Sequence, residues 1–427
     1  MKPETMNAYV AILEEELVLA TGCTEPIAIA YAAAKLRETL GSVPERVKAE
    51  VSGNILKNVK SVVVPGTGGM KGIAAAVAAG VIAGDANAEL QVIGSVSKQD
   101  LQNIKAYADK TPIEIACMDD TPCLLDIRLT GYAGADSAVV RIANNHTNVI
   151  NVEKNGDVSL DLPVVASAED HLQDKSVLNL KEILEFANTV PLERIEALIR
   201  RQIDCNSAIA AAGLTGKWGA AVGCTLLDFS NDIRTEARAY AAAGSDARMS
   251  GCELPVVIVS GSGNQGITAS MPVVRFAAHM NVSNEKLIRA VAVSDLITIH
   301  QKTGIGRLSA FCGAVSAGIG AAAGIAYLYD ESYEIIAETV TTAMGMISGT
   351  VCDGAKPSCA AKIAAAVEAG LLSYNMARRG RRFHGGDGIV TRGVEGTIRN
   401  IGILAREGMR ETDKVILKIM LECENDD

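Results

Sequence analysis

GTVCDGAKPSC, residues 349–359, lies between two Ala-rich segments of helical periodicity, and its cysteines Cys352 and Cys359 bracket Gly and Pro residues. A third cysteine, Cys312, stands at the head of another helix of small residues. Three thiols at helix ends are compatible with two arrangements. In the first, the thiols converge on one metal centre, most simply an iron–sulfur cluster with one iron left open to substrate. In the second, they are three separately buried core residues.

Composition restricts the partners and the compartment. The chain has 427 residues, ten cysteines and a formal net charge of −10, which argues against nucleic acid or an anionic membrane surface as partner. Its first residues do not have the basic-then-apolar pattern of a signal peptide, so we expect a cytoplasmic protein. A disulfide framework is not expected there, because reducing compartments keep thiols free.

Residues 308–328 contain no charged side chain and are long enough to cross a membrane. Their Ala, Gly and Ser content is only weakly apolar, and the helical patterns that follow carry charged residues in their interiors. We therefore expect a fully buried core helix in close contact with its neighbours, and no membrane span.

The pattern along the chain predicts an α+β fold in two parts. An N-terminal α/β domain, residues 1–170, carries a mixed sheet and a few helices, and a mostly helical, Ala/Gly-rich domain, residues 171–427, carries the 349–359 loop. Short β-like runs predict strands at residues 47–51, 59–64, 89–93, 113–116, 125–129, 138–142 and 146–152. Helical patterns in the first part cover residues 6–20, 27–40, 71–83 and 98–109.

Cys23 comes directly before a predicted helix start, formed by Thr24, Glu25 and Pro26. The unpaired N–H groups and the helix dipole at such a position favour a thiolate, which would lower the pKa of the thiol. The alternative is an inert, buried turn cysteine, whose pKa is raised by its apolar surroundings.

Two Gly-rich loops precede helices, at residues 65–69 and 261–266. Such loops point backbone N–H groups outward and suit a small carboxylate, although the first does not match a phosphate-binding loop. In the second loop Ser262, Asn264 and Gln265 add uncharged donors, which suit a small zwitterion. The second loop could equally do no more than turn the chain.

Several motifs agree in their order along the chain: ATGCTEP at 20–26, SGNILKN at 52–58, VPGTG at 64–68, SGSGNQG at 260–266, and the set Cys312, Cys352 and Cys359. Together they resemble the L-cysteine desulfidase family, which is similar to the iron–sulfur L-serine dehydratases. The resemblance covers nearly the whole chain. One departure is Gly354, which stands where the dehydratase pattern has Pro.

The resemblance implies a [4Fe-4S] cluster on Cys312, Cys352 and Cys359, with one open iron, and Cys23 as the catalytic base. The implied reaction is β-elimination of L-cysteine to pyruvate, ammonia and hydrogen sulfide without pyridoxal phosphate, by an oxygen-sensitive enzyme. For the substrate carboxylate and amine we expect contacts from residues of the same motifs, namely Thr24, Glu25, Asn54, Lys57, Thr67, Ser262, Asn264 and Gln265.

Two other functions remain open at this point. An L-serine dehydratase would use the same cluster chemistry, because serine and cysteine differ in one atom. A non-catalytic metal- or redox-sensing thiol protein would give Cys23 no role in turnover. From the many apolar helices and the family's habits we also expect a homodimer.

Overall fold

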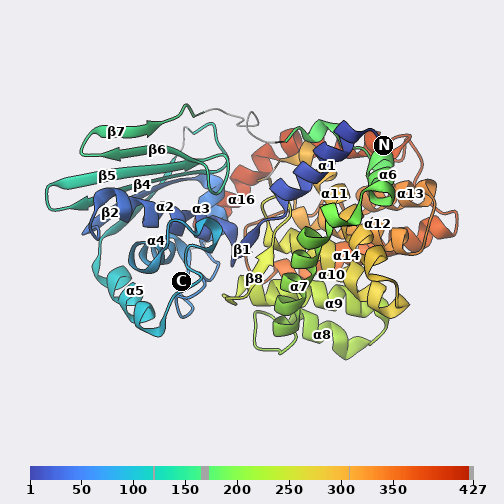
Figure 1. The fold of residues 1–427 in the computed structure, drawn as a ribbon, viewed down its shortest axis with the longest axis horizontal. Helices are drawn as coiled ribbons and strands as arrows, with labels where there is room; N and C mark the ends of the chain where they lie inside the picture. Colours follow the sequence, from blue (N-terminus) through green and yellow to red (C-terminus); the bar gives the residue numbers. More distant parts are fainter. Residues whose placement is uncertain (119–120, 165–172, 307, 423–427) are drawn as a thin grey trace.

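The computed structural model describes residues 1–118, 121–164, 173–306 and 308–422. It is a mixed α+β fold with the sheet in one part and most helices in the other, as predicted (Figure 1). The predicted boundary at residues 170 and 171 lies outside the described residues, so the domain division stays a prediction.

The first part is built on a six-stranded sheet of order β3-β2-β4-β5-β6-β7. Only the β2–β3 pair is parallel, so the sheet is mixed, as expected. Its strands are β2 (Arg46–Ser52), β3 (Ile113–Met118), β4 (Asp126–Ala133), β5 (Asp136–Ala143), β6 (Val149–Lys154) and β7 (Asp157–Asp161). Helix α2 (Thr24–Leu40) packs on β4 and β5. The remaining helical elements here are α3 (Gly53–Val59), α4 (Gly72–Ala83), the 3₁₀ turn η1 (Glu89–Gln91) and α5 (Lys98–Lys110).

Helices make up most of the second part. They are α6 (Leu180–Thr189), α7 (Glu196–Gly213), α8 (Val222–Phe229), α9 (Ile233–Met249), α10 (Gly263–Met280), α11 (Asn284–Ile305), α12 (Gly313–Leu328), α13 (Tyr333–Ile347), α14 (Cys359–Arg378) and α15 (Val394–Ile403). Short 3₁₀ turns η2 (Lys175–Val177) and η3 (Leu192–Arg194) and the π-turn η4 (Leu404–Gly408) connect them. Helix α12 is buried from Ala314 to Leu328, as predicted for the uncharged segment. Within the described residues, no helix is both long and apolar enough to span a bilayer.

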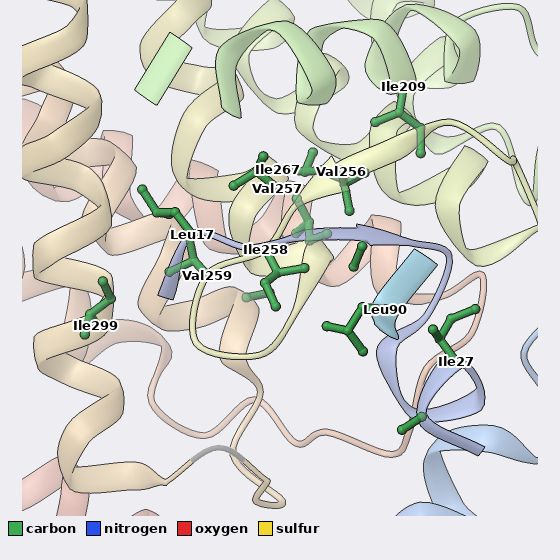
Figure 2. Close-up of a cluster of buried hydrophobic side chains, with 14 of the residues drawn as sticks. Leu17, Ile27, Leu90, Ile209, Val256, Val257, Ile258, Val259, Ile267 and Ile299 are labelled. Atoms are coloured by element: carbon green, nitrogen blue, oxygen red, sulfur yellow. The ribbon is translucent and has the colours of Figure 1, made fainter. Parts of the chain in front are cut away.

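Three elements at the chain ends connect the two parts. Helix α1 (Pro3–Glu16) lies over the helical part, and the short strand β1 (Leu19–Thr21) pairs antiparallel with β8 (Pro255–Val257) (Figure 1). Helix α16 (Arg410–Glu422) returns to pack on α3. Figure 2 shows the buried side chains at this junction, where Leu17, Ile27 and Leu90 lie in one apolar cluster with the β8 segment.

Three sequence predictions of elements are wrong in an informative way. Residues 59–64 do not form a strand: α3 ends at Val59, and Val63 makes only an isolated bridge to Lys71. Residues 89–93 contain the turn η1 in place of a strand. The helix predicted over 6–20 ends at Glu16, because β1 begins three residues later. In the first two cases the apolar side chains are largely buried without forming a strand of a sheet. The apolar pattern in the sequence indicated burial correctly, but burial alone does not specify a strand.

Candidate functional site

A pocket of about 100 Å³ lies where the two parts meet, and it brings Cys23, Cys312, Cys352 and Cys359 together. The other residues that line it come from α2, α3, α9, α10, α11, α12 and α14 and their connecting loops: Glu25, Asn58, Arg248, Ser262, Asn264, Gln265, Lys302, Leu308, Ser309, Phe311, Gly313, Ala314, Gly354, Ala355 and Ile363. The four thiols that the sequence analysis singled out therefore share one pocket, as the convergent arrangement requires.

Backbone pairing places Cys312 and Cys352 beside each other. Phe311 and Val351 form an isolated antiparallel bridge. Cys312 N donates to Thr350 O at 3.1 Å, and Cys352 N donates to Ala310 O at 2.6 Å. This short ladder fixes two thiol-bearing residues that are far apart in sequence, independently of any side-chain contact.

Cys312 is the N-cap of α12 and Cys359 is the first residue of α14, so the packing of these helices sets the position of both thiols. Glycines allow a close approach. A Cβ on Gly318 would lie 2.7 Å from the carbonyl carbon of Ala366, and one on Gly370 would lie 2.7 Å from Gly318 O. The small-residue composition of α12 therefore serves to hold two helix starts at one point.

Gly354 explains the departure from the dehydratase pattern. Its φ is +95°, which proline cannot adopt because its ring fixes φ near −65°. A Cβ at this position would also lie 2.5 Å from Lys57 O, so the 352–359 loop packs directly on the backbone of α3. In this chain glycine lets the loop turn against the first part of the molecule.

The three thiols of the 312/352/359 set influence one another electrostatically. Burial, followed by the neighbouring Cys352 and Cys359, raises the pKa of Cys312 to about 12. Burial also raises the pKa of Cys359, with a further contribution from Cys352. Three thiols this close resist ionising together, so a cationic centre is needed to hold them as thiolates.

The chemistry of the donor set fits an iron–sulfur cluster, because thiolates are the usual protein ligands of such clusters. Among the residues that the structure describes, no group of three or more His, Cys, Asp or Glu side chains is arranged to hold one metal ion. In a cluster each thiolate binds a different iron, so its ligands are spread more widely than those around a single ion. Three cysteines around one pocket fit that wider arrangement.

Cys23 is the N-cap of α2, but its thiol is not the activated thiolate that this position suggested. Burial and then the charge of Glu25 raise the pKa of Cys23 well above its ordinary value. The thiol donates to Glu25 Oε2 at 3.1 Å and is 2% exposed as a residue. The cost of desolvation therefore outweighs the helix dipole here.

Glu25 is the counterpart of this protonated thiol. Burial alone would raise the pKa of Glu25, but His146, the hydrogen bond from Cys23 and Arg248 outweigh it and hold that pKa below its ordinary value. Asn58 Nδ2 donates to Glu25 Oε1 at 3.1 Å, and Thr24 Oγ1 lies 3.0 Å from both Glu25 Oε2 and Gly261 O, so its single proton is shared between these two acceptors. Glu25 is thus an ionised, fixed acceptor beside the Cys23 proton.

The remaining predicted contacts divide into two groups. Glu25, Ser262, Asn264 and Gln265 line the pocket. Four others are outside its lining and have local partners or packing: Thr24 donates to Gly261 O at 3.0 Å, Asn54 is buried on α3, Lys57 is ion-paired with Asp413 of α16, and Thr67 donates to Val64 O at 2.6 Å. In this structure these four residues hold neighbouring elements together and do not line the pocket.

Sequence reasoning missed Asn58, Arg248 and Lys302, which all line the pocket. Asn58 had a usable signal, because it follows Asn54 by one helical turn within the SGNILKN motif. Arg248 and Lys302 had none. Each is a cation near the end of an ordinary helical pattern, and only the structure shows that they are 2% and 5% exposed.

The fold and the thiol-lined pocket define a mixed α+β protein with a small buried site at the junction of its two parts. The family described as serine dehydratase alpha chain matches residues 87–418. That span includes Cys312, Cys352 and Cys359. It begins after Cys23, Glu25 and Asn58, so these three lining residues lie outside the match.

Similar proteins extend over the whole chain. A UPF0597 protein of Desulfitobacterium hafniense is 55% identical over 97% of this chain and 96% of its own length. UPF0597 proteins of Finegoldia magna and Treponema denticola are 47% and 46% identical, over 98% and 97% of this chain and 100% and 97% of their own. The chain belongs to the serine dehydratase alpha-chain family. Membership indicates a lyase of the serine dehydratase type, in a family that is generally associated with iron–sulfur clusters.

Proposed function

We propose that the protein is an iron–sulfur-dependent L-cysteine desulfidase that converts L-cysteine and water to pyruvate, ammonia and hydrogen sulfide. The observation that carries this proposal is the shared pocket of Cys23 with Cys312, Cys352 and Cys359. The last three would hold a [4Fe-4S] cluster. When bound, this group supplies an open iron as Lewis acid for the leaving sulfur.

The residues of the chain supply the proton chemistry. Cys23 Sγ passes its proton to Glu25 Oε2 along their 3.1 Å hydrogen bond and, as a thiolate, removes the α-proton of the substrate. Asn58 and Thr24 hold the Glu25 carboxylate in place through both of its oxygens. The β-thiolate departs, and water hydrolyses the resulting enamine, through its imine, to pyruvate and ammonia.

L-serine is the second candidate substrate, and the family description favours it. Its hydroxyl would occupy the place of the thiol and leave as water. A steady-state comparison of L-cysteine and L-serine on one preparation decides between them: kcat/KM higher for L-serine would overturn the desulfidase assignment and leave the reaction type unchanged.

The test of the site begins with iron and acid-labile sulfide content of anaerobically purified protein. About four of each per chain are expected, together with sulfide and pyruvate release from L-cysteine. Replacing Cys312, Cys352 or Cys359 by Ala should abolish iron retention. Cys205→Ala, on α7 and outside the pocket, is the matched control.

Cys23→Ala separates a lyase from a metal- or redox-sensing protein. A lyase keeps its iron and loses turnover, because the base is removed and the three proposed ligands remain. Wild-type protein that stays free of iron after anaerobic reconstitution would overturn the cluster assignment. Wild-type protein that retains iron but releases no product from either substrate would favour the sensor.

A further inference from the structure

Arg248 is a buried cation that the proposed proton chemistry does not use. It is the penultimate residue of α9, is 2% exposed, and lines the pocket with the four thiols. Its Nη1 donates to Asn264 Oδ1 at 3.1 Å, a neutral acceptor. Among the described residues no carboxylate is paired with it directly: the ionised Glu25 in the same pocket feels its charge, but no hydrogen bond joins the two side chains, so the donors of the guanidinium are not used by an acid.

The guanidinium is held in one orientation by Gly263, the first residue of α10. A Cβ on Gly263 would lie 2.3 Å from Arg248 Nε and 2.8 Å from Cζ, so the absent side chain makes room for the arginine. Nε itself is enclosed and has no hydrogen-bond partner. Because Nε is enclosed, the two Nη groups are the part of the planar guanidinium that can donate hydrogen bonds to a ligand in the pocket.

The start of α10 is a second, independent feature that attracts an anion. This 18-residue helix begins at Gly263, and its N-cap Ser262 forms no side-chain hydrogen bond to the first turn. Its first N–H groups have no intrahelical partners. Gln265 in that turn is 4% exposed, and its Oε1 has no partner although the residue lines the pocket.

Glu25 does not satisfy these donors. Its two oxygens already accept from Cys23, Thr24 and Asn58. An incoming carboxylate would therefore find the Nη groups of Arg248 and the first turn of α10 in the lining of the same small pocket as the thiols. A carboxylate matches the planar fork of a guanidinium in a way that a single-atom anion does not.

We propose that Arg248 and the first turn of α10 bind the free α-carboxylate of the substrate. Gln265 Oε1 is then available to accept from the α-ammonium group. This inference deepens the proposed function, on which it rests for the identity of the substrate. It restricts the substrate class to small amino acids with an unblocked carboxylate, and it excludes esters, amides and residues followed by a peptide bond.

Two probes that share a thiol test the carboxylate alone. 3-Mercaptopropionate has a thiol and a carboxylate, and cysteamine has a thiol and an amine. Dissociation constants are measured by calorimetry on the anaerobically purified full chain under reducing conditions. Arg248→Gln should weaken 3-mercaptopropionate binding about 100-fold and change cysteamine binding less than about twofold.

Two further variants keep the proposal testable if Arg248→Gln folds poorly. Arg248→Lys keeps the charge and loses the fork, so binding of 3-mercaptopropionate should fall about 10-fold. Asn264→Asp places a carboxylate 3.1 Å from Nη1 and should compete with the probe while leaving the melting temperature unchanged or raised. Arg238→Gln is the control, since Arg238 lies on the same helix, pairs with Glu368 and is outside the pocket.

The outcomes separate this inference from the function it deepens. If 3-mercaptopropionate binds the folded Arg248→Gln variant as tightly as wild type, or does not bind wild type at all, the inference is overturned. If neither L-cysteine nor L-serine turns over but 3-mercaptopropionate binding still depends on Arg248, the proposed function fails and the carboxylate site stands. Turnover of L-cysteine methyl ester at the rate of L-cysteine would also overturn the carboxylate assignment.

Discussion

The Cys23 thiol and the Glu25 carboxylate are both buried and share one hydrogen bond, so each influences the protonation state of the other. Glu25 raises the pKa of Cys23, and the bond from Cys23 helps to keep the pKa of Glu25 low. These two shifts keep the proton on Cys23 at rest, so in the proposed reaction it has to move along the hydrogen bond to Glu25 before the thiol can act as a base.

Glu25→Gln tests this pair with two opposite readouts. Turnover should fall about 100-fold, because the acceptor of the Cys23 proton is lost. Alkylation of Cys23 by iodoacetamide, followed by mass spectrometry of its peptide, should shift to lower pH, since removing the negative charge lowers the pKa of the thiol. Asn58→Ala removes one donor to Glu25 but keeps the Cys23 bond, so its loss of turnover should be smaller. Unchanged turnover in Glu25→Gln would exclude Glu25 as the acceptor.

The buried Asp295 on α11 should make the free energy of unfolding depend on pH, and this effect does not involve the pocket. It is fully buried, accepts from Gln202 Nε2 at 2.9 Å, and burial raises its pKa to about 8. The ordinary value in the unfolded chain is near 3.8, so the folded state binds the proton more tightly. Its contribution to stability is complete below pH 4 and is lost as the pH rises to about 8.

Asp295→Asn removes this titration while keeping the acceptor for Gln202. Relative to wild type, the variant should gain free energy of unfolding between pH 5 and pH 8, by at most about 1.4 kcal/mol per pH unit. Urea unfolding at pH 5, 6.5 and 8 measures the difference. A difference that does not change with pH would mean that Asp295 titrates normally.

At the residue scale the sequence could predict thiols but not the buried cation. Cys23, Cys312 and Cys359 were readable because each stands at a helix start, whereas Cys352 lies in the loop between α13 and α14 and not at a helix end as expected. Arg248 was not readable, because its significance is its burial against Gly263, a contact between two segments with no shared motif. The sequence left two states open for Cys23, an activated thiolate or a buried thiol with a raised pKa, and the structure favours the second because desolvation depends on tertiary neighbours.

The 352–359 loop is the element on which the thiol set depends most directly. Gly354→Ala should distort it, because its φ of +95° is strained for alanine and the added Cβ would meet Lys57 O at 2.5 Å. We expect about 2 kcal/mol or more of destabilisation and loss of iron from anaerobically purified protein. Thermal melting and iron analysis measure the two effects.

Gly349→Ala is the matched control for that experiment. Gly349 lies in the same segment, but a Cβ there would meet nothing within 4 Å. It should therefore keep both its melting temperature and its iron. If both variants lost melting temperature and iron to the same extent, the whole segment would be sensitive to substitution, and a specific contact between Gly354 and α3 would be contradicted.

Elements were predictable where periodicity alone determined them. The helices α2, α4, α5 and α12 and the strands β2 to β6 appear close to their expected positions, because an amphipathic or uniformly buried pattern fixes them. The strand β1 was missed because three residues carry no period, and only its partner β8 makes it a strand. Helix α10 begins at Gly263 within the second Gly-rich loop, since tertiary packing overrides the low helix propensity of glycine.

The whole molecule should unfold as one unit although its sheet and most of its helices are separate in Figure 1. One apolar cluster runs from Tyr9 to Ala405, and β1–β8 pairing and the α3–α16 contact tie the parts together. In urea, fluorescence of Trp218, the only tryptophan, and hydrogen exchange of β4 and β5 should give the same midpoint. Two separated midpoints would show that the sheet part is independently stable.

The homodimer stays a proposal that rests on composition and on the family resemblance. Sedimentation equilibrium on full-length protein should give about twice the 44.6 kDa of one chain. A single species at the monomer mass over the micromolar range would contradict it.

The β1–β8 pair has a consequence for how the protein is made. Cys23 leaves the ribosome early, whereas β8, Arg248 and the 352–359 loop are synthesised long afterwards. At usual translation rates the interval between Cys23 and Cys359 is on the order of tens of seconds. During that time β1 has no strand to pair with and the Cys23 thiol has no pocket around it. If the proposed cluster is present, its iron and sulfide would be delivered only after synthesis of nearly the whole chain, and a nascent chain exposed to oxidant would be vulnerable at Cys23 first.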